Sequence, residues 1–187
     1  MEAHKTKTLD DLLALPEDQK AELIDGEIVM MAPASNDHNE LQAKLVLNIG
    51  VISKKQPKDK DFLRILTEAY TYHDTRNTFM HDIAAFWNSE YVVADKNPTR
   101  AKPFWVCEIL SPSNWKKDTY QVFNILEQQG IPYYWVVSPM LKGITVYKFN
   151  STSKTFDQIT VVQASDGVVS LPPFTTENID VSDLFDI

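Results

Sequence analysis

The chain has 187 residues, with a hydrophobic share of 43% and an aromatic share of 11%. This composition excludes a disordered protein and is sufficient for one core, so we expect a single domain over residues 1–187. Acidic residues outnumber basic residues, 26 to 18, and the formal net charge is −8. General affinity for nucleic acid requires clustered Lys and Arg, so this charge balance argues against it.

Membrane insertion, secretion and disulfide bonding find no support in the sequence. No apolar run approaches the roughly 20 residues that cross a bilayer, and residues 1–13 lack the apolar core of a signal peptide. The single cysteine, Cys107, excludes an internal disulfide and a multi-cysteine zinc site. We therefore expect a cytoplasmic protein that does not bind a membrane.

The first third of the chain predicts a short helix, a hairpin and a long helix. Thr8 followed by Asp11 is typical of a capping box at a helix start. Residues 22–31 contain an Asp-Gly pair, which favours a two-residue hairpin turn. Ser35 is the expected N-cap of a helix that extends to about residue 54. The apolar residues of that helix recur at helical spacing: Leu41, Leu45, Ile49 and Ile52.

The middle of the chain predicts strands and one helix. Strands are expected at residues 62–66, 68–72 and 82–87. Residues 104–110 form a nearly continuous apolar run, which is typical of a central strand covered on both faces. A helix follows over residues 114–129 and ends at Gly130.

Residues 131–137 predict a further strand, and residues 143–149 and 156–162 predict a closing hairpin. The expected fold class is α/β (α+β), a mixed central sheet flanked by helices, with N- and C-terminal β-hairpins. We expect the 104–110 strand to be central and the 114–129 helix to cover one face of the sheet. Residues 178–187 are expected to dock as a short segment at most.

Glu108 is the most informative residue for function, because it lies inside the expected central strand. An ionised carboxylate in a buried strand is costly unless it is paired or binds a cation. The sequence leaves two interpretations of Glu108 open: a buried salt bridge to a Lys or Arg, and a cation site.

Asp82 opens the neighbouring apolar stretch, residues 82–87. Alone, such an acid is typical of the start of a strand. Together with Glu108 it forms a common arrangement for Mg²⁺, which is held by one or two carboxylates, carbonyl oxygens and water. We therefore expect the Asp82 and Glu108 carboxylates to approach one cation, which would polarise a phosphodiester and activate a bound water.

Several sequence blocks resemble the Uma-type restriction endonuclease family of the PD-(D/E)xK nuclease superfamily. The most specific blocks are E-I-L-S-P-S at residues 108–113 and G-I-P-Y-Y-W-V-V at residues 130–137, and the resemblance covers about residues 20–150. It implies a restriction-endonuclease-like fold and DNA cleavage that depends on Mg²⁺ or Mn²⁺. It also implies that Asp82, Glu108 and the carbonyl of Ile109 are the metal ligands.

The resemblance is incomplete around the implied metal site. The family's Pro-Asp is His81-Asp82 here, which keeps the ligand. The family's lysine lies one turn beyond an aspartate that matches Asp118, and this chain has Val122 there. A later aspartate of the family is Ser138. Losing the positive charge of such a lysine typically costs on the order of 100-fold in rate.

Lys116 and Lys117 begin the same predicted helix and are alternative sources of this charge. Lys117 and Val122 are five residues apart, and in an α-helix residues at this spacing point to different faces. A solvated lysine is therefore the favoured interpretation, and Lys117 remains the candidate for a catalytic cation.

His38 matches a histidine typical of the family. By that resemblance it orients a water or a phosphate, and the alternative is a capping or surface histidine. Glu22 is interpreted as an acid at a hairpin or helix end.

The sequence thus predicts a divergent, Mg²⁺-dependent endonuclease that hydrolyses DNA phosphodiesters and is weakened by loss of the family lysine. The alternative is a catalytically inactive interaction module with a nuclease fold, which the acidic charge and Val122 favour. A homodimer is also expected, because restriction enzymes commonly pair to cut both strands. The chain has several aromatic residues beyond the expected needs of one small core: Trp87, Trp115, Tyr133, Tyr134 and Trp135.

Overall fold

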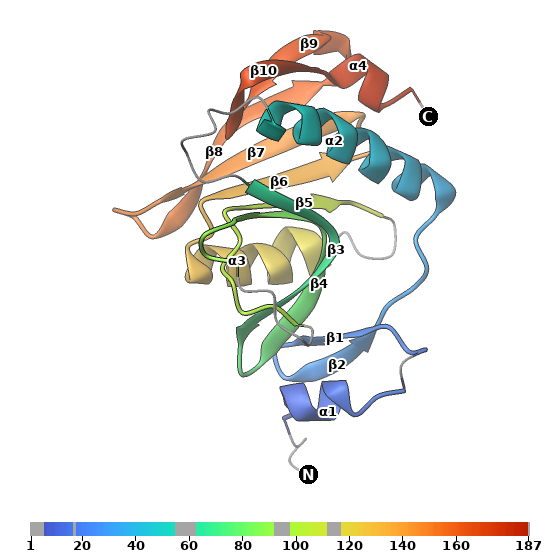
Figure 1. Ribbon diagram of the computed structural model, residues 1–187, viewed down its shortest axis with the longest axis vertical. Helices are drawn as coiled ribbons and strands as arrows, with labels where there is room; N and C mark the ends of the chain where they lie inside the picture. The colour runs from blue at the N-terminus through green and yellow to red at the C-terminus, as the bar shows by residue number, and fades with distance from the viewer. Residues whose placement is uncertain (1–5, 17, 55–62, 92–97, 112–116, 187) are drawn as a thin grey trace.

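The computed structural model describes residues 6–16, 18–54, 63–91, 98–111 and 117–186. Within these ranges, eight strands form one sheet in the order β2-β1-β4-β5-β6-β7-β8, and β3 pairs with β4 (Figure 1). The strands are β1 (Ala21–Ile24), β2 (Glu27–Met30), β3 (Leu63–Asp74), β4 (Asn77–Trp87), β5 (Trp105–Ile109), β6 (Tyr133–Ser138), β7 (Gly143–Asn150) and β8 (Thr155–Gln163). Strands β5 and β6 are parallel and their other neighbours antiparallel, so the sheet is mixed, as predicted.

Helices cover both faces of this sheet. The helical segments are α1 (Leu9–Leu13), α2 (Asn36–Lys54), the π-helical turn η1 (Lys117–Val122), α3 (Phe123–Gln129), the 3₁₀ turn η2 (Ala164–Asp166) and α4 (Val181–Leu184). Helix α2 packs on one face and α3 on the other (Figure 1). The predicted caps are confirmed, because Thr8 and Asp11 form a capping box and the Ser35 hydroxyl accepts the N–H of His38.

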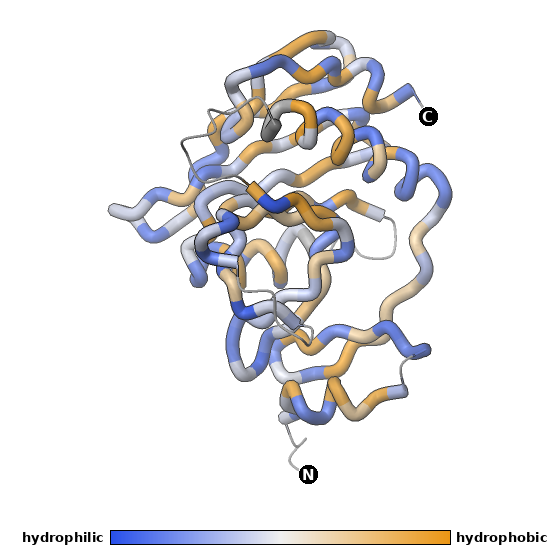
Figure 2. Tube along the Cα trace, viewed as in Figure 1, coloured by the Kyte–Doolittle hydropathy of each residue, from blue (hydrophilic) through white to orange (hydrophobic). Residues whose placement is uncertain are grey.

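Strand β5 is central, as the apolar run predicts. All five of its residues are buried, and the strand lies between β4 and β6. Trp105 and Cys107 join the hydrophobic cluster that contains the buried residues of α2, whereas Val106 joins the cluster that contains α3. Hydrophobic and hydrophilic residues alternate along α2 in Figure 2, as an amphipathic helix on a sheet requires.

The β3–β4 hairpin differs from the prediction. Residues 63–74 form one strand instead of two, because pairing with β4 keeps the same register on both sides of Glu68, which takes a φ of 48°. Strand β4 begins at Asn77, so Asp82 lies inside a strand and does not open it. The long hairpin extends the sheet beyond β5 and brings β1 against β4.

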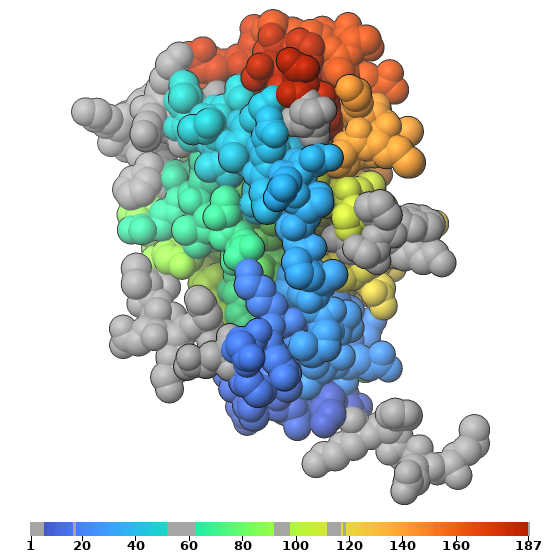
Figure 3. Space-filling view, turned by 90° about the vertical axis from the view of Figure 1, so that its right-hand side faces the viewer, coloured from blue at the N-terminus to red at the C-terminus, as the bar shows by residue number. Residues whose placement is uncertain are grey.

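The C-terminal residues contribute more than the expected docked segment. Strands β9 (Val168–Leu171) and β10 (Phe174–Asp180) form a second, two-stranded sheet, and α4 follows. The buried residues of this region join the cluster on the α2 side: Leu171, Phe174, Ile179, Val181, Leu184 and Phe185. In Figure 3 the C-terminal region in red lies at the end opposite to the N-terminal region in dark blue. Residues 178–186 therefore dock, but as part of the core and not only as the short segment that the sequence predicts.

Most of the aromatic residues named above as surplus pack within the chain. Tyr134 and Trp135 are completely buried, and Trp87 and Tyr133 pack against the α2-side cluster. Trp115 and the predicted helix start at residues 114–116 lie outside the described residues. The aromatic content consequently no longer argues for a dimer. Within the described part of the chain, no helix has the length and apolar character needed to span a membrane.

Candidate active site

Asp82 of β4 and Glu108 of β5 lie side by side where the backbone pairing of these strands stops. The last register pair in this direction is Ile83 with Cys107. Beyond it, the Glu108 carboxylate accepts the N–H of Asp82 at 3.2 Å, and the Asp82 carboxylate accepts the N–H of Ile109 at 2.7 Å. Two side chains thus take the place of ladder hydrogen bonds, and both carboxylates are held at one point of the sheet.

Glu108 is enclosed by protein. Its residue is 4% exposed, and Nδ1 of His81 lies 2.6 Å from its Oε1 atom. Burial raises the pKa of Glu108 well above 4.5, and the charge of Asp82 raises it further, whereas the charge of Lys117 lowers it. Burial also lowers the pKa of His81 to about 3, so His81 is neutral near pH 7.

Helix α2 reaches Asp82 with two side chains. Nε2 of His38 lies 3.2 Å from Oδ1 of Asp82, and the amide of Gln42 donates to the backbone carbonyl of Asp82 at 2.7 Å. The side chain of Asp82 is 22% exposed, so this carboxylate is accessible where that of Glu108 is enclosed. His38 therefore belongs to the same cluster as Asp82 and is not a surface histidine.

Lys117 points into the same region and is held by Glu22. The Lys117 ammonium donates to the Glu22 carboxylate at 2.8 Å, and that side chain also accepts the N–H of Met80 at 3.0 Å. Glu22 is 1% exposed in strand β1, and the Lys117 side chain is 19% exposed. The interpretation of Lys117 as a solvated lysine was therefore wrong, whereas Glu22 does lie in a hairpin, as expected, and is buried there with Lys117 as its partner.

The physical reason for the Lys117 error is the π-helical turn η1. In a π-helix the hydrogen bonds join residues five apart, so Lys117 and Val122 lie one above the other and not on different faces. Val122 itself is 1% exposed and packs in the apolar cluster with Ile125 and Leu126. The sequence position that carries the lysine in the family thus holds an apolar core residue here. The positive charge comes instead from Lys117, at the start of the same turn.

The donor set of the cluster fits a hard cation. Two carboxylates repel each other in a buried place, and a divalent ion between them would remove this repulsion. The N–H and C=O groups of a strand residue point to the same neighbour. Because the Ile109 N–H points to Asp82, its carbonyl oxygen faces the same region. Among the described residues, no group of three or more His, Cys, Asp or Glu side chains is arranged to hold a metal, so a cation here would use backbone oxygen and water as further ligands.

The fold and the paired carboxylates define a restriction-endonuclease-like protein. The chain belongs to the Uma2 family, described as "Putative restriction endonuclease", whose model matches residues 9–180. It is also similar to a crystal structure described as "a putative nuclease belonging to DUF820 from Anabaena variabilis ATCC 29413", with 23% identity and a TM-score of 0.74. That alignment covers 95% of this chain and 97% of the other, and at this identity it shows a shared fold. No curated protein matches the chain.

Sequence reasoning missed three residues of this cluster. Glu22 is buried in a strand that the hairpin pattern identified correctly, but nothing in the pattern indicated its partner. His81 was read only as a replacement for proline, and it bonds to Glu108. His73 was not considered, although it lies 3.1 Å from His81 through the two Nε2 atoms. The contacts of all three join segments far apart in sequence or depend on strand pairing.

Proposed function

We propose that the chain is a divalent-metal-dependent endonuclease that hydrolyses DNA phosphodiester bonds. The observation that carries this proposal is the juxtaposition of Asp82 and Glu108, each bonded to the other's strand, with the charge of Lys117 acting on Glu108. In this proposal Asp82, Glu108 and the carbonyl of Ile109 hold Mg²⁺ or Mn²⁺. When bound, such an ion polarises the phosphodiester and lowers the pKa of a coordinated water.

The surrounding side chains have separate tasks in this proposal. Lys117 stabilises the negative charge that develops on the phosphate oxygens, and Glu22 fixes the position of its ammonium group. His38 orients a water or a phosphate oxygen beside Asp82. Lys117 is held by Glu22 of β1, and His38 by Asp82 of β4, which is the preorganisation that electrostatic stabilisation requires.

The acidic charge of the chain bears on how DNA would bind. With a net charge of −8, binding cannot rest on a general basic surface. Recognition would instead depend on local contacts around the cluster and on the cation itself. The same charge supports the second candidate function, a catalytically inactive interaction module that retains the nuclease fold.

A plasmid assay with Mg²⁺ and with Mn²⁺ separates these functions. We expect the parent protein to relax or linearise supercoiled plasmid and Asp82→Asn to abolish cleavage. Asp157→Asn is the matched control, because Asp157 is exposed on β8 and bonds only to Asn150 among the described residues. Calorimetry with Mn²⁺ on the same proteins tests the metal site directly, and Asp82→Asn is expected to lose binding there.

The outcomes lead to distinct conclusions. Cleavage by the parent and by Asp157→Asn, but not by Asp82→Asn, supports the endonuclease. Mn²⁺ binding that depends on Asp82, without cleavage of any DNA tested, favours the interaction module with a retained metal site. Equal Mn²⁺ binding by the parent and Asp82→Asn contradicts the proposed ligand set.

A further inference from the structure

A chain of two histidines leads from Glu108 to the far side of the β3–β4 hairpin. Nδ1 of His81 lies 2.6 Å from Oε1 of Glu108, and Nε2 of His81 lies 3.1 Å from Nε2 of His73. His81 is completely buried, so its ring nitrogens have no access to water. The histidine that replaces the family's proline therefore connects the candidate metal ligand to a residue of another strand.

Aromatic packing fixes both rings. His73 stacks on Phe79 with ring centroids 4.3 Å apart and an angle of 16° between the planes. The His81 ring packs in a T-shaped arrangement against both of these rings. Its centroid lies 5.2 Å from that of His73 and 5.0 Å from that of Phe79. A rotation of His81 would have to displace these rings, so its contact with Glu108 is held in one geometry.

The hydrogen-bonding capacity of each group determines which atom donates in the two contacts Glu108–His81 and His81–His73. An ionised carboxylate only accepts, so His81 donates to Glu108 from Nδ1 whenever Glu108 holds a cation. A neutral imidazole has one donor and one acceptor, which leaves Nε2 of His81 as an acceptor. The proton between the two Nε2 atoms must then be on His73, so a donor at this position supports the Nδ1-protonated tautomer of His81.

We propose that His73 is a positioning residue for Glu108 that acts through His81 by fixing its Nδ1-protonated tautomer. This inference rests on the proposed function only in so far as Glu108 holds a cation. Without His73, Nε2 of His81 would be buried without a partner, and protonation at that atom would compete. A Nδ1 atom without a proton repels an ionised Glu108 in place of donating to it. Outer hydrogen-bond partners of metal ligands typically contribute about 10- to 100-fold to metal affinity.

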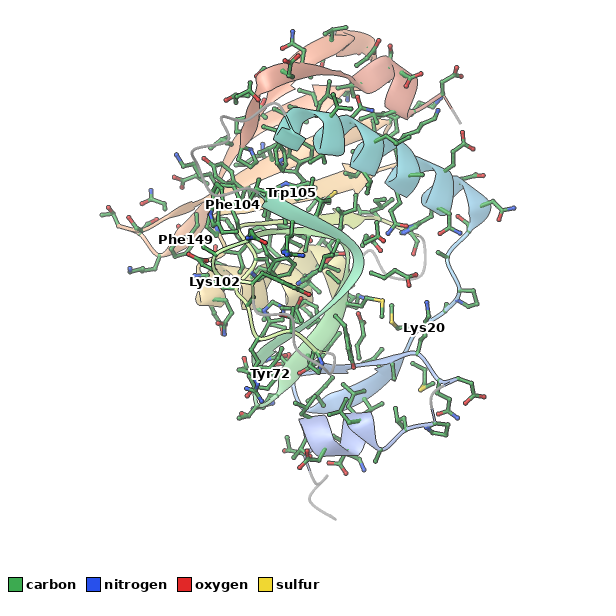
Figure 4. The ribbon with its side chains drawn as sticks, viewed as in Figure 1. Lys20, Tyr72, Lys102, Phe104, Trp105 and Phe149 are labelled. Carbon is green, nitrogen blue, oxygen red and sulfur yellow. The ribbon has the colours of Figure 1, made fainter. Side chains whose placement is uncertain are left out.

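A pocket makes His73 accessible from solvent. It has a volume of about 250 Å³, and its lining includes Tyr72, His73, Lys102 and Gln129. Tyr72 and Lys102 lie on the left of the β3–β4 hairpin in Figure 4, whereas the start of α2, which carries His38, lies on the right in Figure 1. A small molecule in this pocket can therefore reach His73, and neither Asp82 nor His38 belongs to the pocket lining.

Three substitutions separate hydrogen bonding from packing. His73→Phe keeps an aromatic ring on Phe79 and removes the nitrogen atoms. His73→Gln keeps an N–H donor at a similar reach. His73→Ala opens a space beside the pocket that added imidazole can fill. Thermal unfolding of the full chain identifies variants that fold.

The measurements are Mn²⁺ affinity by calorimetry and the tautomer of His81 by ¹⁵N NMR of the imidazole, with and without diamagnetic Mg²⁺. We expect His73→Phe to bind Mn²⁺ about 10-fold or more weakly and to show mixed His81 tautomers. His73→Gln should keep most of the affinity and a single tautomer. Imidazole should restore both properties to His73→Ala, and the same buffer without imidazole should not.

Unchanged Mn²⁺ affinity and an unchanged His81 tautomer in His73→Phe would overturn the inference and leave His73 with a packing role. If the parent binds no Mn²⁺, the proposed metal site is rejected. The NMR comparison without metal then still tests whether His73 fixes the tautomer of His81. An Nδ1-protonated His81 in the parent that becomes a mixture of tautomers in His73→Phe then supports the proposal, and an Nε2-protonated His81 in the parent, or identical spectra of His81 in both proteins, rejects it.

Discussion

Asp82 and Glu108 each bind a backbone N–H group of the strand that carries the other, so neither carboxylate can move without breaking a contact to its neighbour. This reciprocal arrangement holds two like charges together in a largely buried place. Such a placement is unfavourable for a structural role alone, because a paired carboxylate usually faces a cation.

Lys117→Met is expected to reduce DNA cleavage by about 100-fold, because it removes one preorganised positive charge. It should also lower the free energy of unfolding by about 1–3 kcal/mol, since the buried Glu22 loses its partner. Cleavage rates and urea unfolding measure the two effects.

The double variant Glu22→Gln/Lys117→Met separates stability from catalysis. Removing both charges should restore much of the stability, because no buried charge is left unpaired, while cleavage stays low. Lys148→Gln is the control for the loss of one positive charge, because Lys148 is exposed on β7. Recovery of cleavage in the double variant would show that Lys117 acts only as a structural partner of Glu22.

Val122→Lys restores the family's lysine in sequence and is expected to harm the protein. Val122 is 1% exposed among apolar residues, so a lysine there should cost about 2 kcal/mol or more of stability. In the proposed function Lys117 already supplies the charge, so we expect no faster cleavage from the fraction that folds. A stable variant with a markedly higher rate would mean that Lys117 does not supply that charge.

Acidification is expected to destabilise the fold through His73. Burial lowers the pKa of His73 well below 6.5, the charge of His81 lowers it further, and the charge of Asp74 raises it. In the unfolded state the histidine takes up a proton as the pH falls below 6.5, so the unfolded state binds more protons and stability declines with falling pH. Urea unfolding at several pH values should show a weaker decline in His73→Phe. His81 remains in that variant and acts in the same direction, so some decline persists. An identical slope in the two proteins would show that folding does not lower the pKa of His73.

Leu184→Ala tests whether the C-terminal region is part of the main core. Leu184 is completely buried in the α2-side cluster, so its truncation should cost about 2–5 kcal/mol of unfolding free energy. Leu141→Ala is the control, because Leu141 is 66% exposed. Equal unfolding midpoints for the two variants would mean that the tail docks without stabilising the core.

Homodimerisation remains a prediction based on the resemblance to restriction enzymes. Light scattering at tens of micromolar is expected to return twice the 21.4 kDa mass of the chain. Strand β8 is at the end of the strand order and exposes Ile159 and Val161, so it offers a surface for a second copy. Val161→Lys should then shift the mass to that of the monomer, and a parent protein that is already monomeric contradicts the prediction.

Local sequence determined much of this molecule. The apolar run at residues 104–110 predicted a central strand, Ser35 and Gly130 set helix ends, and Asp-Gly made a hairpin turn. Each of these depends on neighbours within a few residues, which is the range that propensity and periodicity describe. Asp82 and Glu108 were identifiable because acids are rare in apolar strands.

Tertiary structure decided which side chains meet around these acids. Lys117 bonds to Glu22 from 95 residues away, and the π-helical turn that aims it breaks the α-helical spacing assumed from sequence. His73 and His81 meet only because a long hairpin pairs their strands. The C-terminal residues, which look like a tail, fill a hydrophobic cluster built by the rest of the chain. Contacts of this kind depend on the packing of segments that are distant in sequence, so local sequence patterns do not predict them.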